Sequence, residues 1–480
     1  MNDRKGFGSN FGFLMAAVGS AVGLGNIWGF PNKMGANGGF PFLILYLALA
    51  LCCGVIIMLG ELALGRKTGH GAVGAYQSIS KRFKWLGWLG IAAAALIFSF
   101  YSALGGYCLR YVVVNFGNLI GAEFGTNGVG GADVFQGLLS QPDVSIAFAL
   151  AFMLITMLVV MSGVGGGIER VCSVGMPALF FILIICIIRS CTLPGAADGL
   201  KYMFVPGWAV ANGIIDEAPG FWRVLTSAGG QMFFSLSLGA GVMITYGSYL
   251  DKKQDLGKSA MIIVGMDTVV ALMAGLCVIP GRFALDPNGA LGGPELLFIT
   301  MQNVFDKMGP AGPVFGILFY LLVFFAAISS SISMLEVIVA HFCDKAREKG
   351  KGDRRKLYSA IAVVICAALC ALVCADGMGS NHISPAELLG LAGAKLPGWS
   401  TSWLGLFDSV AEGLLMPLGA LLMCLMISWE LKPDALRQEI LLNGENRPWV
   451  YDFFRLCVKY ITPLCMLMIL YGQISDFFIV

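Results

Sequence analysis

Charged residues are scarce in this 480-residue chain: Asp, Glu, Lys and Arg together make up 12% of it, where about 25% is usual in soluble proteins. Hydrophobic residues make up 57%, and the mean hydropathy is +0.79. These values exclude an ordinary soluble globular protein and indicate a chain that crosses a membrane many times. The net charge of +2 gives no support to a nucleic-acid partner or to a strongly acidic substrate.

The sequence also lacks the residue patterns of a catalytic or metal centre. Its three histidines, His70, His341 and His382, are far apart, and its fourteen cysteines show no CxxC pairing. Because the cysteines lie mostly within apolar segments, we interpret them as small buried residues and not as disulfides or metal ligands. No HExxH motif, no GxSxG motif with a nearby histidine and no clear acidic dyad is found. We therefore expect a protein that is not an enzyme.

Eleven apolar segments are long enough to cross a membrane, since a spanning helix needs about 20 apolar residues. The expected spans are approximately 10–34, 40–64, 86–116, 145–163, 171–189, 222–249, 257–283, 311–343, 357–376, 405–430 and 450–478. Residues 1–10 hold no separate apolar signal region, so the first span is expected to stay in the mature chain. Most Lys and Arg residues fall in the loops on one side if the N-terminus is cytoplasmic, which predicts an outside C-terminus.

The first span is interrupted by small and polar residues. The run Gly19-Ser20-Ala21-Val22-Gly23-Leu24-Gly25-Asn26 places three glycines within seven residues at the depth where exposed backbone is most costly. This pattern predicts a broken helix whose free ends can bind ions and charged groups. A small-residue packing face between helices explains this stretch, taken alone, equally well.

A second interruption lies in the span 222–249, at Ser235-Leu236-Ser237-Leu238-Gly239-Ala240-Gly241. The two breaks are five apolar segments apart. Interrupted helices at matching places in two halves of a chain are a strong sequence sign of the binding site of a secondary transporter.

These two stretches resemble the helix 1 and helix 6 signatures of the neurotransmitter:sodium symporter family, in its prokaryotic amino-acid transporter branch. The likeness rests on 19–28 and on Gln231-Met232-Phe233-Phe234-Ser235-Leu236-Ser237-Leu238-Gly239, and it covers nearly the whole chain. It implies an all-α polytopic membrane protein with the LeuT-type fold, in one domain over residues 1–480. Two inverted repeats of five helices, about 10–189 and 222–430, would be followed by an extra helix at about 450–478.

The resemblance also implies two sodium sites built from oxygen atoms. The first would use Ala21, Asn26, Ser235 and Asp267, together with the carboxylate of the substrate. The second would use the carbonyls of Gly19, Val22 and Ala326 and the hydroxyls of Ser329 and Ser330. From the residues alone, the serines of the run 329–333 could equally satisfy themselves on carbonyls of their own helix.

The implied substrate is a neutral hydrophobic α-amino acid. Its carboxylate would face the free amides of the first break and Tyr101, although a tyrosine there could also simply anchor a packing interface. The implied substrate-binding residues are Ser20, Ala21, Leu24, Gly25, Ile97, Tyr101, Phe234, Ser235, Ser237, Ala240, Ser330 and Met334. No charged side chain is among them, so burying a charged substrate side chain would be costly. The small Ala240 suggests room for a large or aromatic side chain.

The resemblance also implies which residues form the gates on the two sides of the site. Arg4, Asp344 and Tyr249 match the cytoplasmic gate, whereas Tyr101 and Phe234 match the outer lid. At the outer gate, Gly29 stands where the family carries arginine, and Asp408 is the candidate acidic partner.

The buried carboxylate of Asp267 could balance the charge of sodium in place of chloride, which predicts chloride-independent transport; a protonated, purely structural Asp267 is the alternative. Two other functions stay open, a proton-coupled transporter of the same fold and an amino-acid sensor that does not transport. The expected location is the inner cell membrane.

Overall fold

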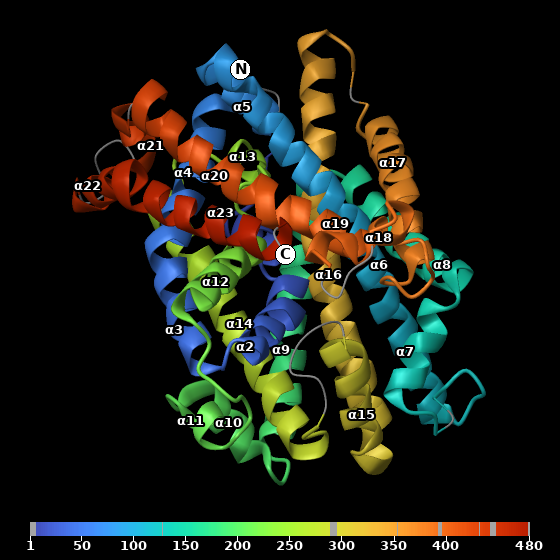
Figure 1. The fold of residues 1–480 in the computed structure, drawn as a ribbon. Helices are drawn as coiled ribbons and strands as arrows, with labels where there is room; N and C mark the ends of the chain where they lie inside the picture. Colours follow the sequence, from blue (N-terminus) through green and yellow to red (C-terminus); the bar gives the residue numbers. More distant parts are fainter. Residues whose placement is uncertain are drawn as a thin grey trace.

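A computed structural model describes residues 6–126, 128–288, 295–352, 354–391, 396–431, 433–441 and 448–478, and the regular structure of these residues is helical (Figure 1). Nine segments among them are long and apolar enough to cross a membrane. Their helices are α3 (Phe40–Leu49), α4 (Val55–Thr68), α6 (Lys84–Ile120), α8 (Pro142–Met161), α9 (Glu169–Cys191), α14 (Leu256–Leu285), α16 (Gly312–Glu348), α17 (Arg355–Asp376), α19 (Trp403–Val410), α20 (Met416–Leu425), α22 (Pro448–Leu456) and α23 (Thr462–Phe478).

Two further spans are broken. Helix α1 (Asn10–Ala21) and the segment that contains the turn η1 (Gly25–Gly29) and α2 (Phe30–Ala36) form a pair bent by 45°. The span at 222–249 consists of α12 (Phe221–Leu236) and the short α13 (Val242–Gly247), neither of which is long enough to cross alone. Each of the eleven predicted spans therefore corresponds to helix, and the spans at 10–34 and 222–249 are each interrupted by a short non-helical break.

Some helices extend beyond the predicted boundaries. Helix α6 begins at Lys84 and ends at Ile120, where Gly121 adopts a left-handed conformation (φ 69°) and its N–H bonds to the carbonyl of Gly117. This is the usual way in which glycine ends a helix. Helix α16 runs on to Glu348, through a polar final turn that the hydropathy pattern assigned to a loop.

Short helices connect the spans. They are α5 (Ala72–Ile79), α7 (Gly131–Leu139), α10 (Ala196–Phe204), α11 (Trp208–Ala211), α15 (Met301–Asp306), α18 (Pro385–Leu388) and α21 (Arg437–Ile440). Figure 1 shows α7, α10, α11 and α15 at the end of the molecule opposite the N-terminus and α5. We call these the α10 end and the N-terminal end.

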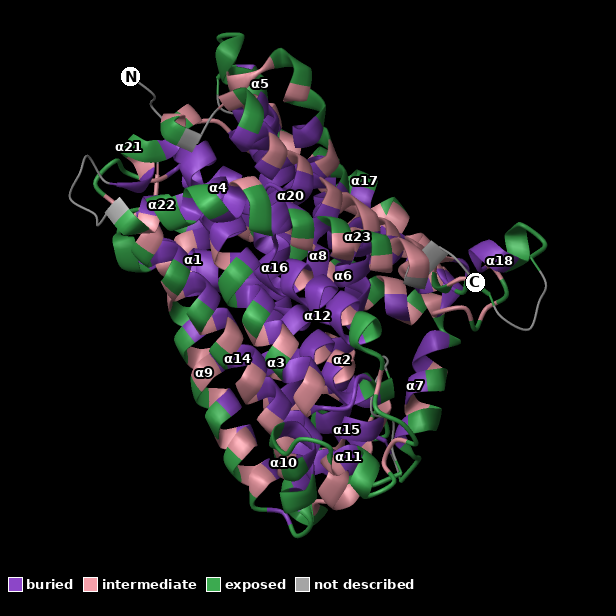
Figure 2. Ribbon diagram, turned by 60° about the vertical axis from the view of Figure 1, so that its left-hand side comes forward, coloured by how far each residue is buried: buried purple, intermediate pink, exposed green. Residues whose placement is uncertain are grey.

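Helices α6, α12 and α16 lie in the interior, and α9 and α14 carry exposed and half-buried residues along their outer faces (Figure 2). In the span that contains α6, 78% of the most apolar stretch of 18 residues is buried, whereas in the span that contains α9 the value is 28%. Large apolar side chains such as Phe181 and Val364 are exposed on the perimeter. Such an apolar perimeter is what a bilayer would cover.

Candidate ion and substrate site

The first break lies where the sequence predicts it. Helix α1 ends at Ala21, Val22 takes an extended conformation (φ −73°, ψ 100°), and helical hydrogen bonding resumes at Gly25. All three residues are buried. Backbone that leaves the helix at membrane depth is thus enclosed by protein, as the absence of water there requires.

Glycine is needed at this break because other elements approach its backbone closely. A Cβ atom at Gly23 would lie 2.3 Å from both Ser330 Oγ and Tyr101 Oη. The N–H of Leu24 donates a hydrogen bond to Tyr101 Oη at 2.5 Å. The hydroxyl of Tyr101 therefore already contacts the amide of Leu24, where the carboxylate of a substrate is expected to bind.

Three of the four predicted ligands of the first sodium site, Asn26, Ser235 and Asp267, are joined by hydrogen bonds. Asn26 Nδ2 donates to Asp267 Oδ1 at 2.7 Å and to the Asp267 carbonyl at 2.9 Å. Ser235 Oγ donates to both carboxylate oxygens of Asp267, at 3.0 and 2.9 Å, and Tyr46 Oη donates to Oδ2 at 3.1 Å. Asp267 has no exposed surface. Helices α3, α12 and α14 and the turn η1 thus bring together one carboxylate and three neutral polar groups, while Ala21 lies at the end of α1.

The five predicted ligands of the second site also meet. Ser329 Oγ lies 3.4 Å from the Val22 carbonyl oxygen and 3.0 Å from that of Ala326, and Ser330 Oγ lies 3.4 Å from the Gly19 carbonyl oxygen. Ser330 Oγ also donates to the Ser20 carbonyl at 3.0 Å. Two hydroxyls of α16 thus lie among the carbonyls of Gly19, Ser20 and Val22, at the end of α1, and the carbonyl of Ala326 in α16 itself. A neutral, all-oxygen donor set suits a hard monovalent cation. Among the described residues, no group of three or more His, Cys, Asp or Glu side chains is arranged to hold a metal ion.

The second break is formed by three residues with positive φ. Ser237 (53°), Gly239 (79°) and Gly241 (74°) carry the chain from α12 to α13. A Cβ atom at Gly239 would lie 2.1 Å from the carbonyl oxygen of Met416, so no other residue fits there without a shift of the backbone. The N–H of Gly239 donates to Glu61 Oε1 at 2.7 Å, and the Glu61 side chain is fully buried.

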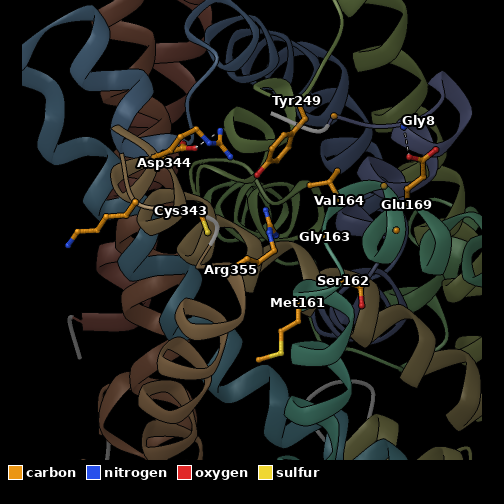
Figure 3. Close-up of a pocket in the computed structure, with 16 residues that line it drawn as sticks. Gly8, Met161, Ser162, Gly163, Val164, Glu169, Tyr249, Cys343, Asp344 and Arg355 are labelled. Atoms are coloured by element: carbon orange, nitrogen blue, oxygen red, sulfur yellow. Dashed lines mark hydrogen bonds and ion pairs between the residues drawn. The ribbon is translucent and has the colours of Figure 1, made fainter. Parts of the chain in front are cut away.

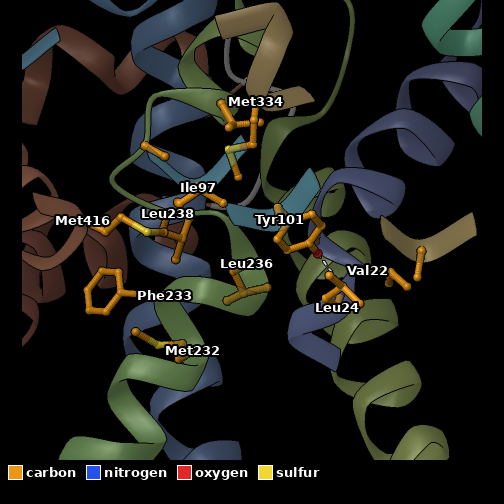
Figure 4. Packing of buried hydrophobic residues seen from close by; sticks show 14 of the residues in the cluster. Val22, Leu24, Ile97, Tyr101, Met232, Phe233, Leu236, Leu238, Met334 and Met416 are labelled. Atoms are coloured by element: carbon orange, nitrogen blue, oxygen red, sulfur yellow. Dashed lines mark hydrogen bonds between the residues drawn. The ribbon is translucent and has the colours of Figure 1, made fainter. Parts of the chain in front are cut away.

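A small cavity lies between the two breaks. Figure 4 shows three of its lining side chains, Tyr101, Ile97 and Met334, together with the bond from Leu24 to Tyr101. Its lining residues are Ala21, Gly25, Ile97, Tyr101, Phe234, Ser237, Ser330 and Met334. Its volume is about 10 Å³, which is the room that one water molecule needs. Side chains such as Met334 and Phe234 must move before an amino acid can enter.

The other predicted substrate residues, Ser20, Leu24, Ser235 and Ala240, are buried and do not line this cavity. Ser20 Oγ donates to Ser333 Oγ at 2.7 Å, and the Ser20 carbonyl accepts from Ser237 Oγ at 3.1 Å. Leu24 and Ser235 make the bonds described above. Ala240 has no exposed surface, and its effect on pocket size stays a prediction.

A cavity of about 1000 Å³ opens at the N-terminal end (Figure 3). The gate residues Tyr249 and Asp344 line it, and Asp344 Oδ2 accepts a hydrogen bond from the N–H of Gly71 at 3.1 Å. Phe7 packs edge-on against Tyr249, with ring centroids 6.2 Å apart. The predicted partner Arg4 lies outside the described residues.

Two charged residues beside this cavity were not predicted. Glu336 has no exposed surface, and its carboxylate accepts hydrogen bonds from Arg355 at 2.5 and 3.0 Å and from Tyr249 Oη at 2.6 Å. In Figure 3, Tyr249 and Arg355 point toward one another. A lone carboxylate inside the apolar span 311–343 was the available signal for Glu336. Arg355 could not be paired with it from sequence, because their contact depends on how α16 and α17 pack.

The rings of Tyr101 and Phe234, which both line the small cavity, have their centroids 6.2 Å apart. Farther out, Lys33 of α2 forms an ion pair with Glu412, in the turn η8 (Ala411–Leu415) that follows α19. Asp408 interacts electrostatically with both. The sequence had indicated Asp408 as the acidic residue of this gate and had missed Lys33 and Glu412.

The chain matches the model of the Sodium:neurotransmitter symporter family over residues 4–127 and 132–478. It is 36% identical over 477 residues to the uncharacterized sodium-dependent transporter YhdH of Bacillus subtilis, covering 97% of each chain. It is 30% identical over 459 residues to an uncharacterized sodium-dependent transporter of Methanocaldococcus jannaschii, covering 91% of this chain and 84% of that one.

Among solved structures, the crystal structure of MhsT in complex with L-phenylalanine matches with a TM-score of 0.83 at 33% identity, over 98% of this chain and 100% of MhsT. The multi-pass helical architecture is thus the LeuT-type fold, and it serves transport and not enzymatic catalysis. The chain belongs to the sodium:neurotransmitter symporter family.

Proposed function

We propose that this protein imports a neutral hydrophobic α-amino acid together with two sodium ions, by alternating access. The observation that carries the proposal is the cavity between the two helix breaks, which is lined by Ile97, Phe234 and Met334 and by no charged side chain. A charged substrate side chain would lose its hydration there without gaining a partner. MhsT, which shares the fold, was crystallised with L-phenylalanine, and this agrees with a hydrophobic substrate.

The polar groups around the cavity suit the α-amino and α-carboxylate groups. The carboxylate would take the place that the N–H of Leu24 and the hydroxyl of Tyr101 define, beside the positive end of the outer half of helix 1. In that place it would also neighbour Asn26 and could complete the first sodium site. Direct ligation of sodium by the substrate would couple the binding of the two, because each then raises the affinity for the other.

The proposed sodium sites are the two oxygen clusters described above. The site at Ser329 and Ser330 is neutral, whereas the site at Asn26 and Ser235 includes the carboxylate of Asp267. That carboxylate would supply the negative charge for which other transporters use chloride. We therefore propose that transport requires sodium and not chloride.

The sodium gradient is sufficient to drive accumulation. A membrane potential of about 100 mV contributes roughly 2.3 kcal/mol for each charge moved inward. A tenfold sodium gradient adds about 1.4 kcal/mol per ion, so two ions provide roughly 7 kcal/mol, or about a 10⁵-fold accumulation of a neutral substrate.

We also propose an orientation. The N-terminal end carries α5 with its basic flanks and the basic tip between α16 and α17, which favours a cytoplasmic location for it. The α10 end then faces outward, and the C-terminus lies outside. The inner cell membrane is the expected site.

A binding screen tests the proposed function. Thermal unfolding of the purified protein would be followed with each of the twenty amino acids, in sodium or potassium gluconate, with no chloride present. We expect stabilisation by hydrophobic amino acids in sodium alone, because a ligand raises stability only where it binds the folded state. Stabilisation by charged amino acids instead, or equal stabilisation in potassium, would contradict the proposal.

A further inference from the structure

Two cysteines face each other where α9 packs against α14, toward the α10 end. Figures 1 and 2 show these helices side by side, and they are in direct contact. The thiols of Cys186 in α9 and Cys277 in α14 are hydrogen-bonded to one another. Both thiols are free, and both line one cavity of about 10 Å³. Only 6% of Cys186 and 3% of Cys277 is exposed, so the contact is enclosed by the two helices.

The register of the two helices explains this contact. A Cβ atom at Gly281 of α14 would lie 3.0 Å from Ser190 Oγ of α9. Ser190 follows Cys186 by four residues and Gly281 follows Cys277 by four, which is about one helical turn. Because glycine has no side chain, the helices approach closely at that level, and the cysteines meet one turn below it. The thiol pair thus results from how the helices pack, and not from the rotamer of one side chain.

A third cysteine nearby is occupied by the backbone of α14. Pro280 lies inside α14 and has no N–H, so the carbonyl of Leu276, four residues earlier, lacks its helical donor. Cys191, the half-buried last residue of α9, donates to this carbonyl through Sγ at 3.6 Å. The hydrogen of Cys191 therefore serves the helix interrupted by Pro280, and Cys186 is the thiol that contacts Cys277.

The helices that carry the thiol pair also support the two oxygen clusters. Helix α14 contains Asp267, whose carboxylate belongs to the first cluster. Helix α9 packs against the first break, where a Cβ atom at Gly19 would lie 3.1 Å from Met176 Sδ and 3.4 Å from Cys172 Sγ. A covalent bond between α9 and α14 would fix these supports relative to one another. Any step of transport in which α9 shifts against α14 would then be blocked.

We propose that Cys186 and Cys277 are an oxidation site, at which a small uncharged disulfide, RSSR, converts the two thiols into a disulfide bond between α9 and α14. One cysteine sulfur attacks the oxidant as thiolate, and the first RS⁻ leaves and is protonated to RSH. The other cysteine sulfur attacks the mixed disulfide and releases the second RSH. Two electrons pass from the cysteines to the oxidant, and the two thiol protons end on the two RSH molecules.

The expected effect of this bond is to stop transport while leaving the binding site intact. That effect rests on the proposed function, whereas the oxidation itself does not. The proposed orientation places the α10 end outside the cell, where disulfides form and persist.

Peptide mapping of the full chain in lipid nanodiscs tests the site. The protein would be treated with dipyridyl disulfide, blocked with N-ethylmaleimide and digested without reductant. We expect a linked pair of peptides that contain Cys186 and Cys277, which separates when a reductant is added. Cys191→Ser keeps a donor for the carbonyl of Leu276 and should form the same link, as should Cys108→Ser, a change of another buried cysteine, in α6. A link from Cys191 instead, or pyridyl adducts on Cys186 and Cys277 without a link, would overturn the site.

Uptake by proteoliposomes tests the effect of the bond. Oxidation should slow sodium-driven uptake of the amino acid at least about tenfold, because a blocked conformational step limits the cycle, and a reductant should restore it. Sodium-dependent binding should stay within about twofold. Cys186→Ala and Cys277→Ala, which cannot form the bond, should each keep their uptake under the same treatment. Unchanged uptake by the linked protein, or an equal loss in these variants, would overturn the effect on transport. The link is measured without amino acid, so a protein that transports nothing even when reduced would count against the proposed function alone.

Discussion

Replacing Asp267 by Asn tests how the first sodium ion is held. The carboxylate is fully buried in α14 and accepts hydrogen bonds from Asn26, Ser235 and Tyr46, at 2.7 to 3.1 Å. An asparagine has nearly the same shape and keeps one oxygen for these donors. The substitution therefore removes the negative charge with little change in packing.

The expected loss of sodium affinity can be worked out from the negative charge that the substitution removes. Two unit charges 4 Å apart attract by about 4 kcal/mol at an effective dielectric constant near 20. The remaining amide oxygen and the easier burial of a neutral side chain offset part of this lost attraction. We therefore expect the free energy of sodium binding to weaken by about 2–4 kcal/mol, which is about a 30- to 1000-fold loss of sodium affinity. Added chloride could replace the lost charge through Tyr46, Gln231 and Ser235, and should then restore part of the affinity.

Sodium titration of radiolabelled amino-acid binding, in gluconate and then in chloride, measures both effects. Asp198→Asn, an exposed carboxylate of α10, serves as control for handling losses. A sodium affinity for Asp267→Asn that stays within about twofold of the unmodified protein in gluconate, a change of less than about 0.5 kcal/mol, would refute the reasoning. A chloride requirement of the unmodified protein would refute it as well.

Three further substitutions test other parts of the site. Ser330→Ala should weaken sodium binding by at least about tenfold, because the site loses one of its few ligands. Ser331→Ala should not, because the Ser331 hydroxyl has no hydrogen-bond partner in the described part of the chain. Sodium titration of uptake measures both effects. Met334→Ala should favour tryptophan over valine by about tenfold in competition binding, because it enlarges the cavity; an unchanged preference would exclude Met334 from the pocket. Gly239→Ala should lower the free energy of unfolding by about 3 kcal/mol or more and reduce the yield of monodisperse protein. Gly265→Ala should do neither, because a Cβ atom at Gly265 would lie in open space.

Hydrophobic patterning predicted the helices, and small and polar residues inside two of the apolar segments predicted the breaks. Apolar segments of spanning length can only be helices at membrane depth, and clustered glycine and serine predicted the departures at Val22 and at 237–241. The short helices α10 and α15 were missed, because they lie outside the apolar spans and carry no comparable signal. Their positions depend on the spans that they connect.

The candidate ligands came from the resemblance to the symporter family, because the residues alone left helix packing as an alternative. The structure brings Asn26, Ser235 and Asp267 together in one cluster, and Ser329 and Ser330 together with the carbonyls of the first break in another.

The charged pairs were harder to predict. Lys33 looked like an ordinary loop-proximal cation, and its partner Glu412 is 379 positions away in the sequence. Glu336 and Arg355 are similarly joined only by the packing of α16 against α17. Sequence spacing does not contain such contacts, although a carboxylate within an apolar span marks one member of each pair.

Uptake by proteoliposomes tests the central claim most directly. The purified chain would be reconstituted in potassium gluconate and diluted into sodium gluconate with valinomycin, so that a sodium gradient and an inside-negative potential act together without chloride. We predict that a hydrophobic amino acid selected in the binding screen accumulates well above its external concentration and leaves again when the sodium gradient is collapsed. Binding that saturates at one molecule per protein, with no accumulation under these conditions, would contradict sodium-coupled import.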